Sequence, residues 1–240
     1  MKNVTLLALD TSTEACSVAL LRGGEKTHLA QFAQREHTKH ILPMVDEILA
    51  QAGITLHQVD ALVFGRGPGS FTGVRIGAGI AQGLAFGAAL PVIPVSNLTA
   101  MAQAAYVQYQ AENVLTAIDA RMNEVYFAQW QAQKVRSDFG EFLDWQPIID
   151  EQVCCPSKAI EQVAQQHHEN AVLAGTGWAA YPELNEANLG KATEITLPSA
   201  LYMLDLALPK WFAGETISPL EIEPIYLRNE VTWKKLPGRE

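Results

Sequence analysis

The stretch VDALVFGRGPGSFTGVRIGAGIAQGLAFGA (residues 59–88) decides the fold. It begins with an apolar strand, 59–64, passes through a glycine-rich turn, 65–73, and continues into a helical segment, 74–88. Strands that alternate with helices in this way build α/β sheets. The stretch therefore predicts an α/β protein.

The rest of the chain extends this pattern in both directions. A three-stranded meander and a helix precede the stretch, and alternating strands and helices follow it. A second, fainter round of the same pattern begins near residue 119, so we expect two lobes, 1–112 and 113–240. Each is expected to be a mixed sheet with a meander followed by helix-strand alternation, and a C-terminal segment of the second lobe could return to the first. The stretches 133–141 and 181–198 read as irregular. Strands are expected at 4–10, 15–21, 27–32, 91–95, 114–118, 124–131 and 171–174, and the other helices at 38–52, 97–109, 156–166 and 199–212.

Composition excludes several classes of protein. The chain has a formal net charge of −9, and 48% of its residues are hydrophobic. No charge-free run approaches the roughly 18 residues of a membrane-spanning helix. The first 120 residues hold 7 basic and 9 acidic side chains and the last 120 hold 10 and 17, so no basic cluster beyond Lys234-Lys235 could bind a phosphate backbone. We therefore expect a cytoplasmic protein that contacts no membrane and no nucleic acid by itself.

The glycine-rich turn has two possible roles. Its position before a helix would let backbone N–H groups hold an anion, but it contains no lysine for a P-loop. Gly65, Gly67 and Gly69 lack the third glycine of the GxGxxG pattern, and Pro68 stands where a GxSxG nucleophile motif around Ser70 needs glycine. The alternatives left open are a tight structural turn and an anion or partner site.

Small residues recur every fourth position on two sides of the following helix. One stripe is Gly73, Gly77 and Ala81, and the other is Gly79, Gly83 and Gly87. We expect one stripe to face the sheet and the other to admit a partner helix at short distance. The expected partner interface also takes in the preceding helix, and its residues are Ile41, Met44, Val45, Ile48, Gly73, Arg75, Ile76, Gly79, Ile80 and Gly83.

Five segments together resemble the TsaB (YeaZ) family, which belongs to the glycoprotease-like superfamily. They are LALDTSTEACSVAL (7–20), REHTKHILPMVDEIL (35–49), GRGPGSFTGVRIGAG (65–79), AIDARMNEVYF (117–127) and PIYLR (224–228). The resemblance implies two lobes of the actin-like ATPase (ASKHA) fold. It also implies a non-catalytic partner of the enzyme TsaD, with the ATPase TsaE, in forming threonylcarbamoyladenosine in tRNA, and contact with tRNA only through that complex. Alone, the same surface would favour a homodimer.

The same resemblance allows a test for nucleotide chemistry. ATPases of this fold place glycines in the first hairpin loop and in the turn that opens the second lobe, but this chain has Thr11 after Asp10 and Arg121 two residues after Asp119. We therefore expect no catalytic residue and no cofactor required by the chain, with ATP or ADP possible in the complex. The alternative is an independent ATP-binding enzyme or peptidase of this fold. Candidate nucleotide-binding residues are Asp10, Thr11, Ser12, Asp119, Gly175 and Gly177.

Two histidines and the chain end complete the candidates. His37 and His40 are spaced by three residues on an expected helix, and no third metal ligand is identifiable. We therefore expect a polar helix start or a partner contact and no metal site. The charged tail, 229–240, is expected to be frayed or to dock as a strand.

Overall fold

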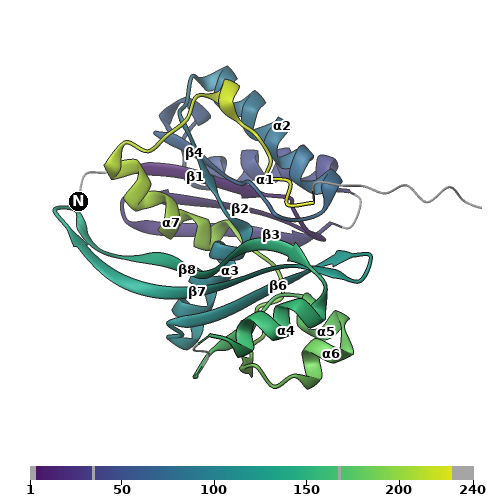
Figure 1. Cartoon of the computed structure of the whole chain (residues 1–240). Helices are drawn as coiled ribbons and strands as arrows, with labels where there is room; N and C mark the ends of the chain where they lie inside the picture. Colours follow the sequence, from purple (N-terminus) through teal and green to yellow (C-terminus); the bar gives the residue numbers. More distant parts are fainter. Residues whose placement is uncertain (1–3, 34–35, 167–168, 229–240) are drawn as a thin grey trace, which may run out of the picture.

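The structure, a computed structural model, describes residues 4–33, 36–166 and 169–228 and consists of two five-stranded mixed sheets (Figure 1). The first sheet has the order β3-β2-β1-β4-β5, with β1 antiparallel to β2 and parallel to β4. β1 and β4 are buried along nearly their whole length, as expected for parallel strands covered on both faces. The strands are β1 (Thr5–Asp10), β2 (Ala15–Arg22), β3 (Glu25–Phe32), β4 (Ala61–Gly65) and β5 (Val92–Val95).

The second sheet repeats this topology. Its order is β10-β9-β6-β7-β8, again with an antiparallel meander on one side and two parallel strands on the other. Strands β6 to β10 thus correspond in order to β1 to β5, which confirms a mixed α/β fold with two lobes of one type. The strands are β6 (Asn113–Arg121), β7 (Glu124–Ser137), β8 (Gly140–Cys154), β9 (Val172–Ala174) and β10 (Lys191–Ala192).

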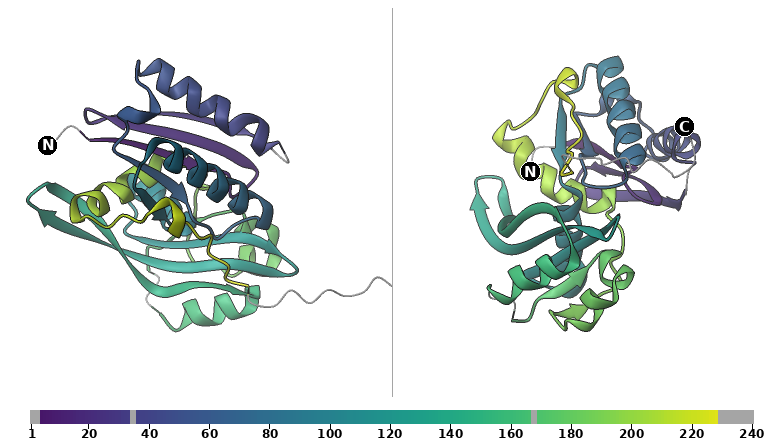
Figure 2. Two further views of the ribbon diagram at one scale, coloured as in Figure 1. Left: turned by 90° about the horizontal axis from the view of Figure 1, so that it is seen from above. Right: turned by 45° about the vertical axis from the view of Figure 1, so that its right-hand side comes forward.

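The helices form three layers around the two sheets (Figures 1 and 2). α1 (His37–Gln51) and α2 (Phe71–Ala88) cover the outer face of the first sheet, with the short η1 (Leu56–Gln58) between α1 and β4. α4 (Pro156–Ala164), α5 (Gly177–Ala180) and α6 (Pro182–Glu186) cover the outer face of the second. α3 (Asn97–Tyr109) and α7 (Ala200–Ala213) lie between the sheets. η2 (Pro219–Glu221) follows α7 and lies against α2.

The two middle helices tie the lobes together. α3 follows the first sheet in sequence but packs on β6, β7 and β9, whereas α7 follows the second sheet and packs on β1, β2, β4 and β5. One apolar core therefore contains side chains from both lobes, among them Leu6, Leu98, Trp130 and Met203. Separate cores lie beneath α1 and α2 and beneath the short helices of the second lobe. The boundary at 112 stays a prediction, and the exchange of helices across it makes separate folding of the lobes unfavourable.

Sequence and structure differ most in the β7–β8 hairpin. The stretch 133–141, expected to be irregular, continues β7 into its turn, and β8 was not predicted at all. The outer half of this hairpin is exposed or half-buried on both faces, so it lacks the alternation of apolar and polar residues that marks a strand.

None of the described helices is long and apolar enough to span a bilayer. The tail 229–240 lies outside the described residues.

Candidate functional site

The loop after β1 is packed beneath the first turns of α2. The Ser70 N–H donates to the Ser12 carbonyl oxygen (2.7 Å). The Thr11 hydroxyl donates to the Gly73 carbonyl oxygen (2.7 Å). A Cβ atom on Gly73 would lie 2.2 Å from the Thr11 carbonyl oxygen, and one on Gly69 would lie 2.5 Å from that of Ser12. These glycines are required because the loop backbone runs directly against the helix.

Asp10, at the end of β1, is enclosed next to this loop with 1% of its surface exposed. Its carboxylate accepts hydrogen bonds from the Asn97 amide (2.9 Å) and the Ser12 hydroxyl (3.0 Å). Burial raises the pKa of Asp10 to about 6, while these hydrogen bonds act to lower it. A Cβ atom on Gly65 would lie 2.2 Å from Asp10 Oδ1, so another glycine of the turn makes room for this carboxylate. The nucleotide-binding role of Asp10, Thr11 and Ser12 stays a prediction. For Asp10 and Thr11 it would require this packing to open.

A cleft of ≈ 1050 Å³ lies between the lobes. One wall is formed by the loop after β1 and the starts of α1 and α2, and the other by the β6–β7 turn and the loop after β9. Of the candidate nucleotide-binding residues, Ser12, Asp119 and Gly175 line this cleft, whereas Asp10, Thr11 and Gly177 do not.

Gly175 and Gly177 bring the loop after β9 against β6. The φ angle of Gly175 is +116°, and a Cβ atom there would lie 2.0 Å from the Ala117 carbonyl oxygen. A Cβ atom on Gly177 would lie 3.0 Å from the same residue. The structure therefore explains both glycines by backbone packing, without a ligand.

The β6–β7 turn has an unusual backbone. Arg121, Met122 and Asn123 have φ angles of +61°, +58° and +60°, in the left-handed region. Each such residue costs roughly 1 kcal/mol or more when it carries a Cβ atom. The Arg121 guanidinium lies 2.9 Å from Asp119 Oδ2 and 3.6 Å from Glu14 Oε1 of the first lobe. The turn thus presents an arginine side chain to the cleft instead of bare backbone.

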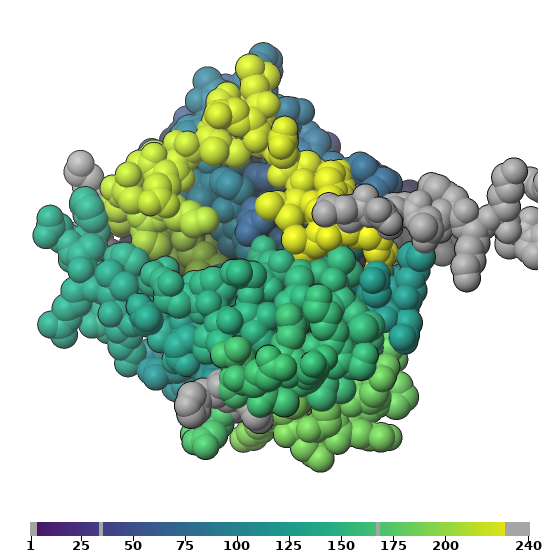
Figure 3. Space-filling model, viewed as in Figure 1, coloured from purple at the N-terminus to yellow at the C-terminus, as the bar shows by residue number. Residues whose placement is uncertain are grey.

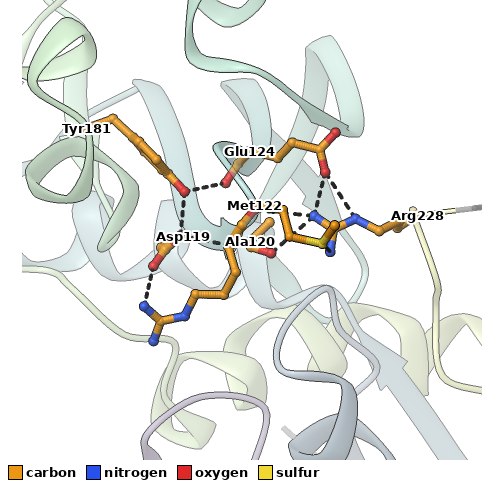
Figure 4. A network of polar contacts seen from close by, with 7 residues as sticks. Asp119, Ala120, Met122, Glu124, Tyr181 and Arg228 are labelled. Carbon is orange, nitrogen blue, oxygen red and sulfur yellow. Dashed lines mark hydrogen bonds and ion pairs between the residues drawn. The ribbon is translucent and has the colours of Figure 1, made fainter. Parts of the chain in front are cut away.

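Side chains from two distant segments hold this turn in place (Figure 4). The Tyr181 hydroxyl donates to Asp119 Oδ1 (2.8 Å), and the pKa of Tyr181 is raised to about 12 by burial and by this carboxylate. From the other side, Arg228 donates through Nε (3.0 Å) and Nη2 (2.5 Å) to Glu124 Oε2. Its Nη2 also lies 3.1 Å from the Ala120 carbonyl oxygen. The C-terminal segment is therefore fastened to the second lobe at Arg228.

The two histidines of α1 have separate partners. His37 is buried, and its Nε2 donates to the Thr13 carbonyl oxygen (2.6 Å). His40 Nε2 lies 3.6 Å from Glu36 Oε2. Within the described ranges, no three His, Cys, Asp or Glu side chains form a group that could hold a metal ion.

The apolar face of α1 was wrongly assigned to the partner interface. Ile41, Met44, Val45 and Ile48 are each at most 6% exposed and belong to the core beneath α1 and α2. A helix that covers a sheet needs one apolar face for that sheet, and α1 packs on β2 with this face. Gly73 is likewise buried, against the loop after β1, and cannot meet a partner.

The remaining interface candidates lie on the outer side of α2. Arg75, Gly79 and Gly83 are exposed, and Ile76 and Ile80 are half-buried. A Cβ atom added to Gly79, Gly83 or Gly87 would meet nothing within 4 Å, so the fold itself does not require these glycines. The two small-residue stripes therefore differ: one packs against the lobe, and the other is open.

Several residues of the cleft and its rim were not predicted. Tyr181 and Glu124 hold the turn, and Phe71 and Tyr226 form an exposed aromatic pair with ring centres 6.1 Å apart. Tyr226 and Arg228 belong to the PIYLR segment that supported the family resemblance, but no spacing in the sequence connects this segment to residues more than 100 positions earlier. Among the residues of the turn, only Arg121 could be noticed in the sequence, because it stands where ATPases of this fold have glycine.

The duplicated topology, the exchanged helices and the cleft between the lobes define an actin-like two-lobed α/β protein. A family model described as "TsaD: tRNA N6-adenosine threonylcarbamoyltransferase" matches residues 29–210. The "tRNA threonylcarbamoyladenosine biosynthesis protein TsaB" of Haemophilus influenzae is 70% identical over 240 residues, which is 100% of both chains. The protein of that name from Escherichia coli is 48% identical over 98% of this chain and 99% of its own. The chain belongs to the TsaB family.

A solved structure agrees with this assignment. "YeaZ from Pseudomonas aeruginosa" matches with a TM-score of 0.81 and 42% identity, over 93% of this chain and 100% of that one. A second structure, described as an uncharacterized protein with similarity to peptidase YEAZ from the same organism, also gives a TM-score of 0.81, with 43% identity over 94% of this chain and 100% of that one.

Proposed function

We propose that the chain is a non-catalytic partner of TsaD, the enzyme that transfers threonylcarbamoyl from threonylcarbamoyl-AMP to a tRNA adenosine, and that it works in the cytoplasm. Membership of the TsaB family supports a role in tRNA threonylcarbamoyladenosine biosynthesis. TsaE, and ATP or ADP in the assembled complex, belong to the same proposal because the family resemblance implies them. Contact with tRNA is expected only through the complex.

The open glycine stripe of α2 carries this proposal. Each glycine inside a helix costs about 1 kcal/mol relative to alanine, and Gly79, Gly83 and Gly87 make no contact that explains the cost. Glycines on an exposed helix face allow another helix to approach closely. Because the chain matches the TsaD family model over most of its length, TsaD is expected to present a corresponding helix, and the two would pack about a pseudo-twofold axis. Without TsaD, a second copy of the chain would take the same place.

The alternative, an independent ATP-binding enzyme or peptidase, has less support. The loop after β1 is closed by α2, and the β6–β7 turn carries Arg121 where a phosphate would need bare backbone. Within the described part of the chain, no hydrogen bond joins a serine or cysteine side chain to a histidine ring, as a nucleophile and its base would require. Steady nucleotide or peptide turnover by the purified chain would reverse this preference.

Association with TsaD tests the proposal directly. The chain and TsaD, mixed at equal concentration, should elute together in size-exclusion chromatography with light scattering at the mass of a heterodimer. Gly83→Leu should abolish this association, because a branched side chain would fill the space for the partner helix. Ala164→Leu, at an exposed position of α4 in the other lobe, is the matched control and should associate normally. Undiminished association of Gly83→Leu would contradict the role of the stripe.

Activity provides the second measurement. TsaD and TsaE should modify tRNA efficiently when the wild-type chain or Ala164→Leu is added and poorly with Gly83→Leu. Equal modification with and without the chain would contradict the role of essential partner.

A further inference from the structure

Exposed apolar side chains gather on α2 and on residues 217–228, called here the C-terminal strap. The strap runs beside α2 (Figure 1) and forms part of the surface on the face of the molecule that Figure 3 shows. Among the described residues, eleven large hydrophobic side chains are exposed, and five of them lie on these two elements. A soluble protein that concentrates exposed apolar groups in this way commonly uses them to bind another protein. The five are Phe71, Phe86, Leu220, Ile225 and Tyr226.

The strap is a fixed part of the lobe surface. Ile217 exchanges two backbone hydrogen bonds with Val92 at the edge of the first sheet, and the Gln82 amide donates to the Pro219 carbonyl oxygen (3.0 Å). Further along, the Ile225 N–H donates to the Arg66 carbonyl oxygen (2.9 Å).

The glycine-rich turn and the second lobe hold the far end of the strap. Gly67, with a φ angle of +98°, makes room for the Ile225 carbonyl oxygen, which would lie 3.3 Å from a Cβ atom. Beyond it, Arg228 ties the strap to Glu124. Since the backbone is held along its length, Leu220 and Tyr226 are presented to a partner without the cost of ordering a loose chain.

A guanidinium that lies against two rings is found at one end of this surface. The Arg75 guanidinium carbon is 3.2 Å from the centre of the Phe71 ring and 4.9 Å from that of the Tyr226 ring. In the described part of the chain, Arg75 has no carboxylate partner within ion-pair distance. Its N–H donors are therefore oriented by the rings and free to bind a carboxylate. Tyr and Arg are also the residue types that most often dominate the energy of protein interfaces.

We propose that the outer side of α2 and the C-terminal strap form one docking surface, in which Phe71, Arg75 and Tyr226 bind a helix of the catalytic partner that carries a carboxylate opposite Arg75. This inference rests on the proposed function and adds the strap to the interface. The part of the chain that matches the TsaD family model ends at residue 210, before the strap begins. The strap therefore lies outside the residues that this chain shares with the TsaD family model, and it suits a pairing between unlike chains, in which this chain supplies the strap.

Calorimetric titration of the purified chain with TsaD tests the surface. Tyr226→Ala and Arg75→Met should each weaken binding about tenfold or more, as loss of an interface anchor does. Phe32→Ala removes an exposed ring from β3, the edge strand opposite β5, where the strap pairs with Val92, and should bind like the wild type. Higher salt should weaken binding of the wild type more than that of Arg75→Met, because only the former makes the charged contact. The three substituted side chains are exposed, so thermal melting should confirm that the variants fold.

The outcomes separate the two proposals. If wild-type protein does not bind TsaD, the proposed function itself fails. If Gly83→Leu abolishes binding while Tyr226→Ala and Arg75→Met bind like the wild type, the proposed function stands and the docking role of the strap is overturned. If Tyr226→Ala weakens self-association of the chain, measured by sedimentation, but leaves TsaD binding unchanged, the surface belongs to a second copy and the proposed occupant is wrong.

Discussion

The loop after β1 and the turn after β6 occupy the same place in the two lobes, yet they are stabilised in opposite ways. The first is buried, and its backbone packs on glycines of α2. The second is exposed, contains three left-handed residues and is held by the side chains of Tyr181 and Arg228. The difference follows from the helix after the fourth strand of each lobe, which has 18 residues in α2 but only 4 in α5.

A long helix can cover a loop, and a helix of one turn cannot. In the first lobe α2 closes the loop with one face and leaves the glycines of its opposite face uncovered. In the second lobe the turn stays open to the cleft and is fixed by hydrogen bonds from segments that arrive later in the chain. One topology thus provides a closed lobe, whose loop is covered by a helix, and an open lobe, whose turn stays exposed to the cleft.

The closed lobe should be the more sensitive to an added methyl group. Gly73→Ala would place a Cβ atom 2.2 Å from the Thr11 carbonyl oxygen, and we expect it to lower the free energy of unfolding by about 3 kcal/mol. Gly79→Ala, six residues along the same helix, meets nothing within 4 Å and should raise that free energy by up to about 1 kcal/mol. Urea unfolding of both variants measures the difference. Equal stabilities would show that the loop is not packed against α2 as described.

Much of the fold, but little of the candidate site, could be predicted from the sequence. The spacing of apolar residues located α1 correctly to within a residue at each end, because the helix must cover β2. The same spacing does not say whether an apolar face meets the protein's own sheet or a partner, so Ile41 and Ile48 were assigned to the wrong surface. Ile41 and Ile48 are buried against the protein's own sheet, and only the structure shows this burial.

The spacing of the glycines in α2 does not show what each glycine packs against. Their spacing predicted two stripes on α2, but not that Gly73 packs on the loop while Gly83 is open. The contacts of Tyr181 with Asp119 and of Arg228 with Glu124 join residues 62 and 104 positions apart. No local pattern in the sequence reports such contacts, because they depend on how the two lobes and the C-terminal segment pack.

The enclosed carboxylate of Asp10 should make the closed lobe pH-sensitive. Its folded pKa of about 6 lies above the ordinary value of 3.8, so the folded state binds this proton more tightly than the unfolded state does. The resulting stabilisation is fully present below the ordinary pKa and is lost as the pH rises through about 6. We therefore expect Asp10→Asn, which stays neutral, to gain stability over the wild type as the pH rises, by up to about 3 kcal/mol.

Urea unfolding of both proteins at several values between about pH 4 and about pH 7 measures this difference. Asp119→Asn is the control from the second lobe, where the carboxylate pairs with Arg121 at the edge of the cleft. A constant difference between wild type and Asp10→Asn over this range would mean that Asp10 titrates normally and is not enclosed.

Substitution in the β6–β7 turn should change the free energy of unfolding least, and it should raise it, whereas Gly73→Ala lowers it. Arg121→Gly relieves a left-handed residue of roughly 1 kcal/mol of strain, while the flexibility that glycine adds to the unfolded chain offsets part of this gain. The exposed ion pairs of Arg121 contribute little, so we expect a change between zero and a gain of about 1 kcal/mol in urea unfolding. Met122→Gly removes the same kind of strain without removing a charge and should behave alike. A clear loss of stability in Arg121→Gly but not in Met122→Gly would mean that the contact of Arg121 with Glu14 joins the lobes across the cleft, so that the open turn too is fixed by the other lobe.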